Sequence, residues 1–190
     1  MNLNKASQYL SLILRHEPSQ NGVNMSHDGY CSTQQVISAI NNVGFTGFSL
    51  EHLLTIVKQD KKQRYSIKEC NNFIRANQGH SIPVDLGLVP VQPLDVLYHG
   101  TSPKFLELIL NSELKPMNRE FLHLSCDLKT AKMVGKRHAK SQPVQIIHID
   151  AKRLYEEGHQ FYLSDNNVWL SREPISPKYF IEIQSLEKNI

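Results

Sequence analysis

The stretch between Gly79 and Pro93 places the strongest limit on how this chain can fold. It carries five helix- and strand-breaking residues within fifteen positions: Gly79, Pro83, Gly87, Pro90 and Pro93. Such a composition is typical of a linker or crossing segment and not of a periodic element. A length of 190 residues suits one large domain or two small ones. We therefore predict two domains, residues 1–80 and 81–190.

The first helix of the N-terminal part is predicted from its apolar spacing. Apolar side chains recur at steps of three and four, as on one helix face, at Leu3, Ala6, Leu10 and Ile13. Pro18 disfavours helical backbone at Glu17. Arg15 and His16 should therefore lie at the helix end or just past it.

Two further helices and a hairpin are expected before residue 80. Ser32 and Gln35 have the spacing of a capping box, and Ser49 can cap the next helix. Residues 64–67 and 73–76 alternate like two short strands around Asn71-Asn72, which is typical of a hairpin. Helices followed by a hairpin suggest a winged-helix lobe.

The C-terminal part reads mainly as strands with a few helices. Strands are expected over 96–99, 121–125, 144–149, 160–163, 168–170 and 179–183. Helices are expected after Ser102-Pro103, from Asp127 through Gly135, and in a short segment ending at Gly158. The order of elements does not suggest a regular βαβ wind, so the fold class is α+β with mixed or antiparallel sheets.

Composition is that of an ordinary globular protein, with 40% hydrophobic and 21% charged residues. No run of about 20 apolar residues or secretory signal is present, so we expect no membrane contact. Three widely spaced cysteines argue for a reducing, cytoplasmic location. Nothing indicates an obligate assembly, so a monomer is expected.

The net charge of +3 comes from the N-terminal part. Lysine and arginine outnumber aspartate and glutamate by 8 to 5 over residues 1–77 and equal them, 13 to 13, over residues 78–190. This surplus permits a nucleic-acid partner but is equally compatible with a slightly basic surface.

Several well-known sites are absent from the sequence. It has no G-x-x-x-x-G-K-S/T loop, no G-x-G-x-x-G after a strand, and no G-x-S-x-G elbow, which argues against Walker ATPases, Rossmann dehydrogenases and α/β-hydrolases. The nine histidines include no pair with metal-ligand spacing, so no metal site is predicted.

Cations and imidazoles remain as the candidate site: Arg15, His16, Arg64 and Arg119, with His99, Thr101, His123 and Ser125. Three guanidinium groups meeting beside an imidazole would bind a phosphate dianion and stabilise charge developing on it. Each residue alone has a simpler explanation. Arg15-His16 is also what a helix C-terminus favours, Arg64 and Arg119 suit a solvated surface, His123 suits a core, and His99-Gly100-Thr101 suits a plain turn.

Seven segments, in order, make the chain resemble the RNA 2′-phosphotransferases (KptA-like tRNA 2′-phosphotransferases) over nearly its whole length. They are Leu14-Arg15-His16-Glu17-Pro18, Gln63-Arg64-Tyr65, the run from Ile74 to Ser81, Leu97-Tyr98-His99-Gly100-Thr101, Arg119 with His123-Leu124-Ser125-x-Asp127, the run from Val134 to His138, and Val168-Trp169-Leu170.

The resemblance implies a winged-helix lobe that binds RNA and an ADP-ribosyltransferase-like lobe that binds NAD⁺ as co-substrate. It implies that an internal RNA 2′-monophosphate, as at a tRNA splice junction, is transferred to NAD⁺ through an RNA-2′-phospho-ADP-ribose intermediate. Two other functions stay open: a transferase that caps nucleic-acid 5′-phosphates with ADP-ribose, and a non-catalytic winged-helix regulator.

The resemblance also implies roles for individual residues. Arg15, His16, Arg64 and Arg119 would be the catalytic tetrad, in which His16 moves protons because the unperturbed pKa of histidine lies near neutrality. The residues implied to bind NAD⁺ are His99, Gly100, Thr101, His123, Ser125, Asp127, Arg137 and Val168.

Overall fold

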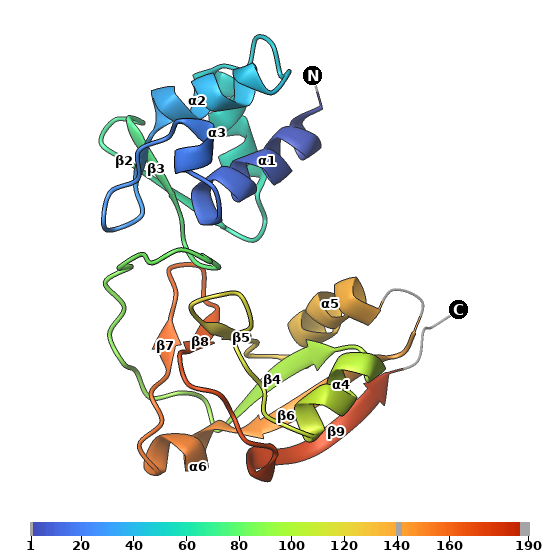
Figure 1. Cartoon of the computed structure of the whole chain (residues 1–190). Coiled ribbons are helices and arrows are strands. Elements are labelled where there is room, and N and C mark those ends of the chain that lie inside the picture. The colour runs from blue at the N-terminus through green and yellow to red at the C-terminus, as the bar shows by residue number, and fades with distance from the viewer. Residues whose placement is uncertain (1, 140–141, 187–190) are drawn as a thin grey trace. The chain divides into compact units, whose positions relative to one another are not determined.

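The computed structural model describes residues 2–139 and 142–186 and divides into two compact units, Met1–Gly87 and Leu88–Ile190 (Figure 1). The division falls seven residues after the boundary predicted at residue 80. Segment 81–87 belongs to the first unit because its backbone bonds there. Ser81 N donates to Arg15 O over 3.0 Å, and Asp85 N donates to His27 O over 3.0 Å.

The first unit holds three helices, a short 3₁₀ turn and one small sheet. Its elements are α1 (Leu3–Arg15), η1 (Ser19–Asn21), β1 (Cys31–Ser32), α2 (Thr33–Asn42), α3 (Leu50–Gln59), β2 (Tyr65–Lys68) and β3 (Phe73–Ala76). The strands pair antiparallel in the order β1-β3-β2. The predicted hairpin is therefore confirmed, and β1 adds a third strand to it.

The helix ends of this unit test the predicted caps. Helix α1 ends at Arg15 and is capped by His16, whose backbone N–H bonds to Leu12 O, as Pro18 predicts. The capping box at Ser32 is wrong. Ser32 is the N-cap of α2, but its side chain makes no capping bond in the described structure. The Gln35 amide oxygen instead accepts from Asn24 N over 2.9 Å.

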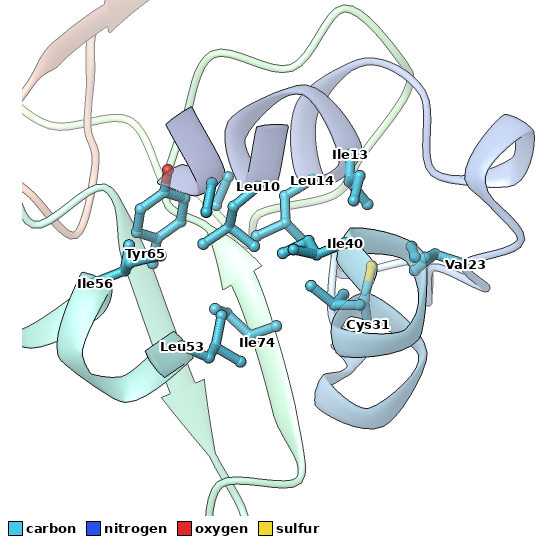
Figure 2. Packing of buried hydrophobic residues seen from close by; sticks show 14 of the residues in the cluster. Leu10, Ile13, Leu14, Val23, Cys31, Ile40, Leu53, Ile56, Tyr65 and Ile74 are labelled. Atoms are coloured by element: carbon cyan, nitrogen blue, oxygen red, sulfur yellow. The ribbon is translucent and has the colours of Figure 1, made fainter. Parts of the chain in front are cut away.

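One hydrophobic cluster joins the helices of the first unit to its sheet (Figure 2). Leu10, Ile13 and Leu14 of α1 are fully buried, as are Leu53 of α3 and Ile74 of β3. The apolar spacing of α1 therefore marks the face that packs on the core. The next residues in sequence, Arg15 and His16, lie at the edge of that core.

The second unit contains six strands in two sheets. Its elements are β4 (Val96–Thr101), α4 (Pro103–Leu110), β5 (Leu122–Leu124), α5 (Leu128–Ala139), β6 (Val144–Asp150), α6 (Ala151–Glu156), β7 (Tyr162–Leu163), β8 (Trp169–Ser171), η2 (Pro177–Tyr179) and β9 (Phe180–Leu186). The strand orders are β4-β6-β9 and β5-β8-β7, and every pair is antiparallel. The α+β class is confirmed.

Helix α5 is longer than predicted because Gly135 lies inside it and not at its end. Two glycines allow α5 to lie directly on β4. A Cβ built on Gly100 would stand 1.9 Å from Ala131 O, and one built on Gly135 would stand 3.2 Å from Gly100 Cα. Both glycines are therefore needed for this close helix–strand contact.

A backbone bridge joins the two sheets of the second unit. Tyr98 N donates to Ser125 O over 2.9 Å, and Ser125 N donates back to Tyr98 O over 2.8 Å. This bridge places the end of β5 beside the middle of β4. Among the described helices, none has the length and apolar character that a membrane span requires.

Candidate active site

In the first unit, the loop after β3 holds the end of α1 by both backbone and side chain. Ser81 Oγ lies 2.8 Å from His16 Nδ1, and Ser81 N donates to Arg15 O. Gly79, with φ +90°, lies against the Arg15 side chain, since a Cβ built there would be 3.5 Å from Cζ. The Arg15-His16 pair is thus fixed by a segment more than sixty residues away in sequence.

Arg64 is anchored by Asp60. The Asp60 carboxylate accepts from Arg64 Nε at 3.0 and 3.1 Å and from its backbone N at 2.7 Å, and Nη2 lies 3.0 Å from Oδ1. The Asp60 side chain is only 4% exposed, against 32% for Arg64. The hydrogen bond that Arg64 donates to Asp60 raises the pKa of Arg64, so the guanidinium stays charged.

Arg64 lies at the same end of the hairpin as Arg15. Asn77 N donates to Arg64 O over 2.8 Å, and two residues later Gly79 meets the Arg15 guanidinium. The Asn77 amide also donates to Gln63 O over 2.7 Å. Asn77 therefore fixes the backbone from which Arg64 projects.

His80 is buried beneath these cations, with 3% of its surface exposed. Burial, followed by the positive charges of Arg15, His16 and Arg75, lowers the pKa of His80 to about 4. The ring is therefore neutral at physiological pH. It adds no charge to a region where cations already gather.

In the second unit, the His99 ring contacts the backbone of His123, the other predicted histidine. His99 Nδ1 is 3.2 Å from His123 O, and because a carbonyl oxygen only accepts, Nδ1 carries the proton. Burial lowers the pKa of His99 to about 4. The ring is therefore neutral, and Nε2 has a free lone pair.

Arg119 adds a cation to this pair. Its Nη1 lies 3.4 Å from His123 Nδ1, and since a guanidinium only donates, His123 Nδ1 is the acceptor. Arg119 is exposed at the surface. Two contacts, of 3.2 and 3.4 Å, therefore join His99 of β4, His123 of β5 and Arg119 of the loop before β5.

The β5–β8 ladder ends at the pair of Leu124 and Trp169, so Ser125 and Val168 are the residues next to its last pair. Along the strand, Ser125 shares its face with His123. Thr101, at the end of β4, is 4% exposed.

Three predicted NAD⁺-binding residues have structural roles or positions of their own. Gly100 is required for the contact with α5. Asp127 caps that helix, since its carboxylate accepts from Thr130 N and Thr130 Oγ1, both at 2.8 Å. These bonds lower the pKa of Asp127. Arg137 lies exposed on the last turn of α5. Their part in binding NAD⁺ stays a prediction.

The structure thus gathers the predicted residues into one group per unit: Arg15, His16 and Arg64 in the first, and His99, His123, Ser125 and Arg119 in the second. The sequence analysis assigned no role to Asp60 or Ser81. Asp60 stands four residues before Arg64, a spacing common for ion pairs, and Ser81 ends one of the seven matching segments. Either signal could have identified them.

The chain matches the family model described as "RNA 2′-phosphotransferase, Tpt1 / KptA family" over residues 2–173. It belongs to the RNA 2′-phosphotransferase family.

Curated relatives resemble it over nearly their whole length. A "Probable RNA 2′-phosphotransferase" of Hahella chejuensis is 43% identical over 177 residues, which is 93% of this chain and 92% of the relative. Proteins with the same name from Herpetosiphon aurantiacus and Flavobacterium johnsoniae are 42% and 41% identical, covering 92% and 94% of this chain and 93% and 95% of theirs.

Proposed function

We propose that this protein removes an internal 2′-monophosphate from RNA, as at a tRNA splice junction, by transferring it to NAD⁺. A phosphate oxygen attacks C1″ of the nicotinamide ribose and nicotinamide leaves, giving RNA-2′-phospho-ADP-ribose. The ribose 2″-oxygen then attacks phosphorus, and its proton passes to the departing RNA 2′-oxygen. The products are RNA with a 2′-hydroxyl, ADP-ribose 1″,2″-cyclic phosphate and nicotinamide.

The observation that carries the proposal is that one segment, from Asn77 to Ser81, contacts both the Arg15-His16 pair and the backbone of Arg64. Two guanidiniums and an imidazole suit a phosphate dianion, because arginine binds phosphate oxygens with several donors and keeps its charge. The phosphate is itself the nucleophile in the first step, so no carboxylate base is needed. Asp60, a carboxylate bonded to this group, is already engaged with Arg64.

The chemistry of the second unit supports a site for NAD⁺. A neutral His99 does not repel the positive charge of nicotinamide, and its Nε2 can accept a bond from a ribose hydroxyl. Ser125 and Thr101 offer further hydroxyl groups. We assign to this unit the ADP-ribosyltransferase-like fold and to the first unit the winged-helix fold.

We assign three roles to the four predicted catalytic residues. Arg15 and Arg64 hold the 2′-phosphate, and Arg119 stabilises charge on it during transfer. His16, held by Ser81 at Nδ1, moves the proton between the 2″-oxygen and the RNA 2′-oxygen through its other nitrogen.

The test is a reaction of purified protein with a 2′-phosphorylated oligoribonucleotide and NAD⁺. We expect nicotinamide and ADP-ribose cyclic phosphate in equal amounts, resolved by chromatography. Arg64→Ala should still bind NAD⁺ but accumulate the ADP-ribosylated RNA. Arg153→Ala provides the control, because Arg153 is an exposed arginine paired with Glu157 outside both groups.

Two outcomes would overturn the proposal. Binding of NAD⁺ with no product from 2′-phosphorylated RNA would leave a non-catalytic nucleotide-binding protein. A stable ADP-ribosylated 5′-phosphate end with no loss of phosphate would indicate a capping transferase.

A further inference from the structure

A cavity of about 370 Å³ opens in the first unit beside His16. Its size lies within the range of roughly 300–1,000 Å³ that is usual for small-ligand pockets. Three separate segments form it: the end of α1 with η1, the turn at Ser26, and the segment that follows Ser81. No residue of the proposed reaction other than His16 lines it.

The walls of this cavity are held in place by backbone hydrogen bonds. On one side, Val23 N donates to Pro18 O over 3.0 Å and closes the η1 turn. On the other, Ser26 N donates to Tyr30 O over 2.8 Å, and Asp85 N ties the segment after Ser81 to His27 O. A cavity fixed in this way needs little reordering to receive a ligand.

The lining is mixed, with more polar than apolar surface. Pro18, Met25, Ile82 and Pro83 supply the apolar surface, and the exposed Gln20 supplies an amide at the rim. Apolar side chains beside hydrogen-bond donors and acceptors suit an aromatic heterocycle, which has an apolar ring face and polar edges.

The charge of the lining argues against a phosphate in the cavity. Among its described lining residues there is no lysine or arginine, and one, Glu17, is acidic. Arg15, the residue before His16, and Arg64 have the opposite charge and do not line the cavity. An uncharged group therefore suits the cavity, while the phosphate suits the two arginines.

We infer that this cavity takes the unpaired base of the nucleotide that carries the 2′-phosphate. The inference rests on the proposed function, which places the 2′-phosphate at His16. The base and the 2′-oxygen are attached to adjacent ribose carbons, C1′ and C2′, so the base is the heterocycle closest to that phosphate. The substrate would then be RNA in which this nucleotide is unstacked.

Binding of two short oligoribonucleotides tests the inference. Both carry the 2′-phosphate, and one has hydrogen in place of the base at C1′ of that nucleotide. We expect calorimetric titration to give a roughly tenfold larger Kd for the oligonucleotide without the base, the scale of a lost base contact. Phosphate removal should show the same difference, mainly in KM.

Gln20→Trp, which fills the rim of the cavity, should weaken binding of the complete oligonucleotide and leave the base-free one unchanged. Gln34→Trp, at an exposed position of α2 outside the cavity, is the matched control. Gln20→Ala, a smaller change, should weaken binding of the complete oligonucleotide to a lesser degree. It keeps the test decisive if the tryptophan variant misfolds.

Equal binding of the two oligonucleotides by the wild-type protein would overturn the inference, whatever the catalytic result. An equal loss of binding of both oligonucleotides by Gln20→Trp would also overturn it. If phosphate were not removed from either oligonucleotide, the proposed function would fail, and the two Kd values would still decide whether the cavity binds the base.

Discussion

Asp60 determines where the Arg64 guanidinium points. Its carboxylate is almost fully buried and bonds to Nε and Nη2. Asp60→Ala should therefore release the Arg64 side chain without removing its charge. We expect turnover to fall by about tenfold or more, since small misplacements of a binding group are costly. NAD⁺ affinity should stay unchanged.

The measurement is single-turnover kinetics with 2′-phosphorylated RNA, which should reveal the same accumulated intermediate as Arg64→Ala. Asp85→Ala is the control, because Asp85 is an exposed carboxylate whose contacts are with His27 at 3.9 Å and with Gly87 N at 2.9 Å. Full activity of Asp60→Ala would show that Arg64 needs no anchor.

His80 should make stability depend on pH. Histidine in an unfolded chain has a pKa near 6.5, and burial lowers the pKa of His80 to about 4. Between these pH values the unfolded state binds one more proton than the folded state at this residue. The free energy of unfolding therefore increases as pH rises through that window and decreases as pH falls through it. For His80 alone the loss between pH 7 and pH 5 is about 2 kcal/mol.

We expect His80→Gln to reduce the difference in the free energy of unfolding between pH 7 and pH 5 by about that amount. Urea titrations at the two pH values measure it. His27→Gln, at a side chain that is 86% exposed, should leave the difference as in the wild type. An unchanged difference in His80→Gln would show that this ring titrates normally.

The residues of the candidate site could be identified from the sequence by their types and spacing. Arginine beside histidine after an apolar stretch indicated a helix end, and the α1 terminus confirms it. The partners of these residues were not predicted, because the signals for them in the sequence are weak. Ser81 meets His16 only because a loop after β3 returns to α1, and Asp60 pairs with Arg64 beyond the end of α3, where helix periodicity no longer applies.

At the level of elements, the contact between α5 and β4 depends on having no side chain at Gly100. Gly100→Ala would place Cβ 1.9 Å from Ala131 O, so the helix must move. We expect a loss of about 3 kcal/mol or more in the free energy of unfolding, the upper part of the range for overpacking. Because Gly100 follows His99, NAD⁺ binding should weaken as well.

Chemical unfolding and NAD⁺ titration measure the two effects. Lys136→Ala, at an exposed position of α5, should change stability by no more than about 0.5 kcal/mol. If Gly100→Ala were as stable as the wild type, α5 could move away from β4 without a loss in the free energy of unfolding.

Strands and helices with clear apolar periodicity were predictable, and short or non-local features were not. Strand β1 has two residues and exists only because it pairs with β3. Gly135 was read as a helix end because glycine usually marks one, whereas here it packs on Gly100. The Ser32 capping box failed because Gln35 bonds to Asn24 instead.

For the whole molecule, charge predicts a modest salt dependence of RNA binding. The net charge is +3, and the surplus lies in residues 1–77. A protein that neutralises about four phosphates of single-stranded RNA should show a slope of about −3 in log K against log salt. Fluorescence anisotropy at several salt concentrations measures it. NAD⁺ affinity should vary much less. A slope beyond about −6 would indicate a far larger contact with RNA.

Each hydrophobic cluster draws its residues from one unit: one cluster from residues 6–76 and two from residues 97–175. A cavity made in one cluster therefore leaves the packing of the other unit intact. Destabilising variants should fall into two groups under limited proteolysis, each leaving a resistant fragment that ends or begins near Gly87. In a cell, quality-control proteases would then degrade the destabilised unit of such a variant first, and the other unit would persist.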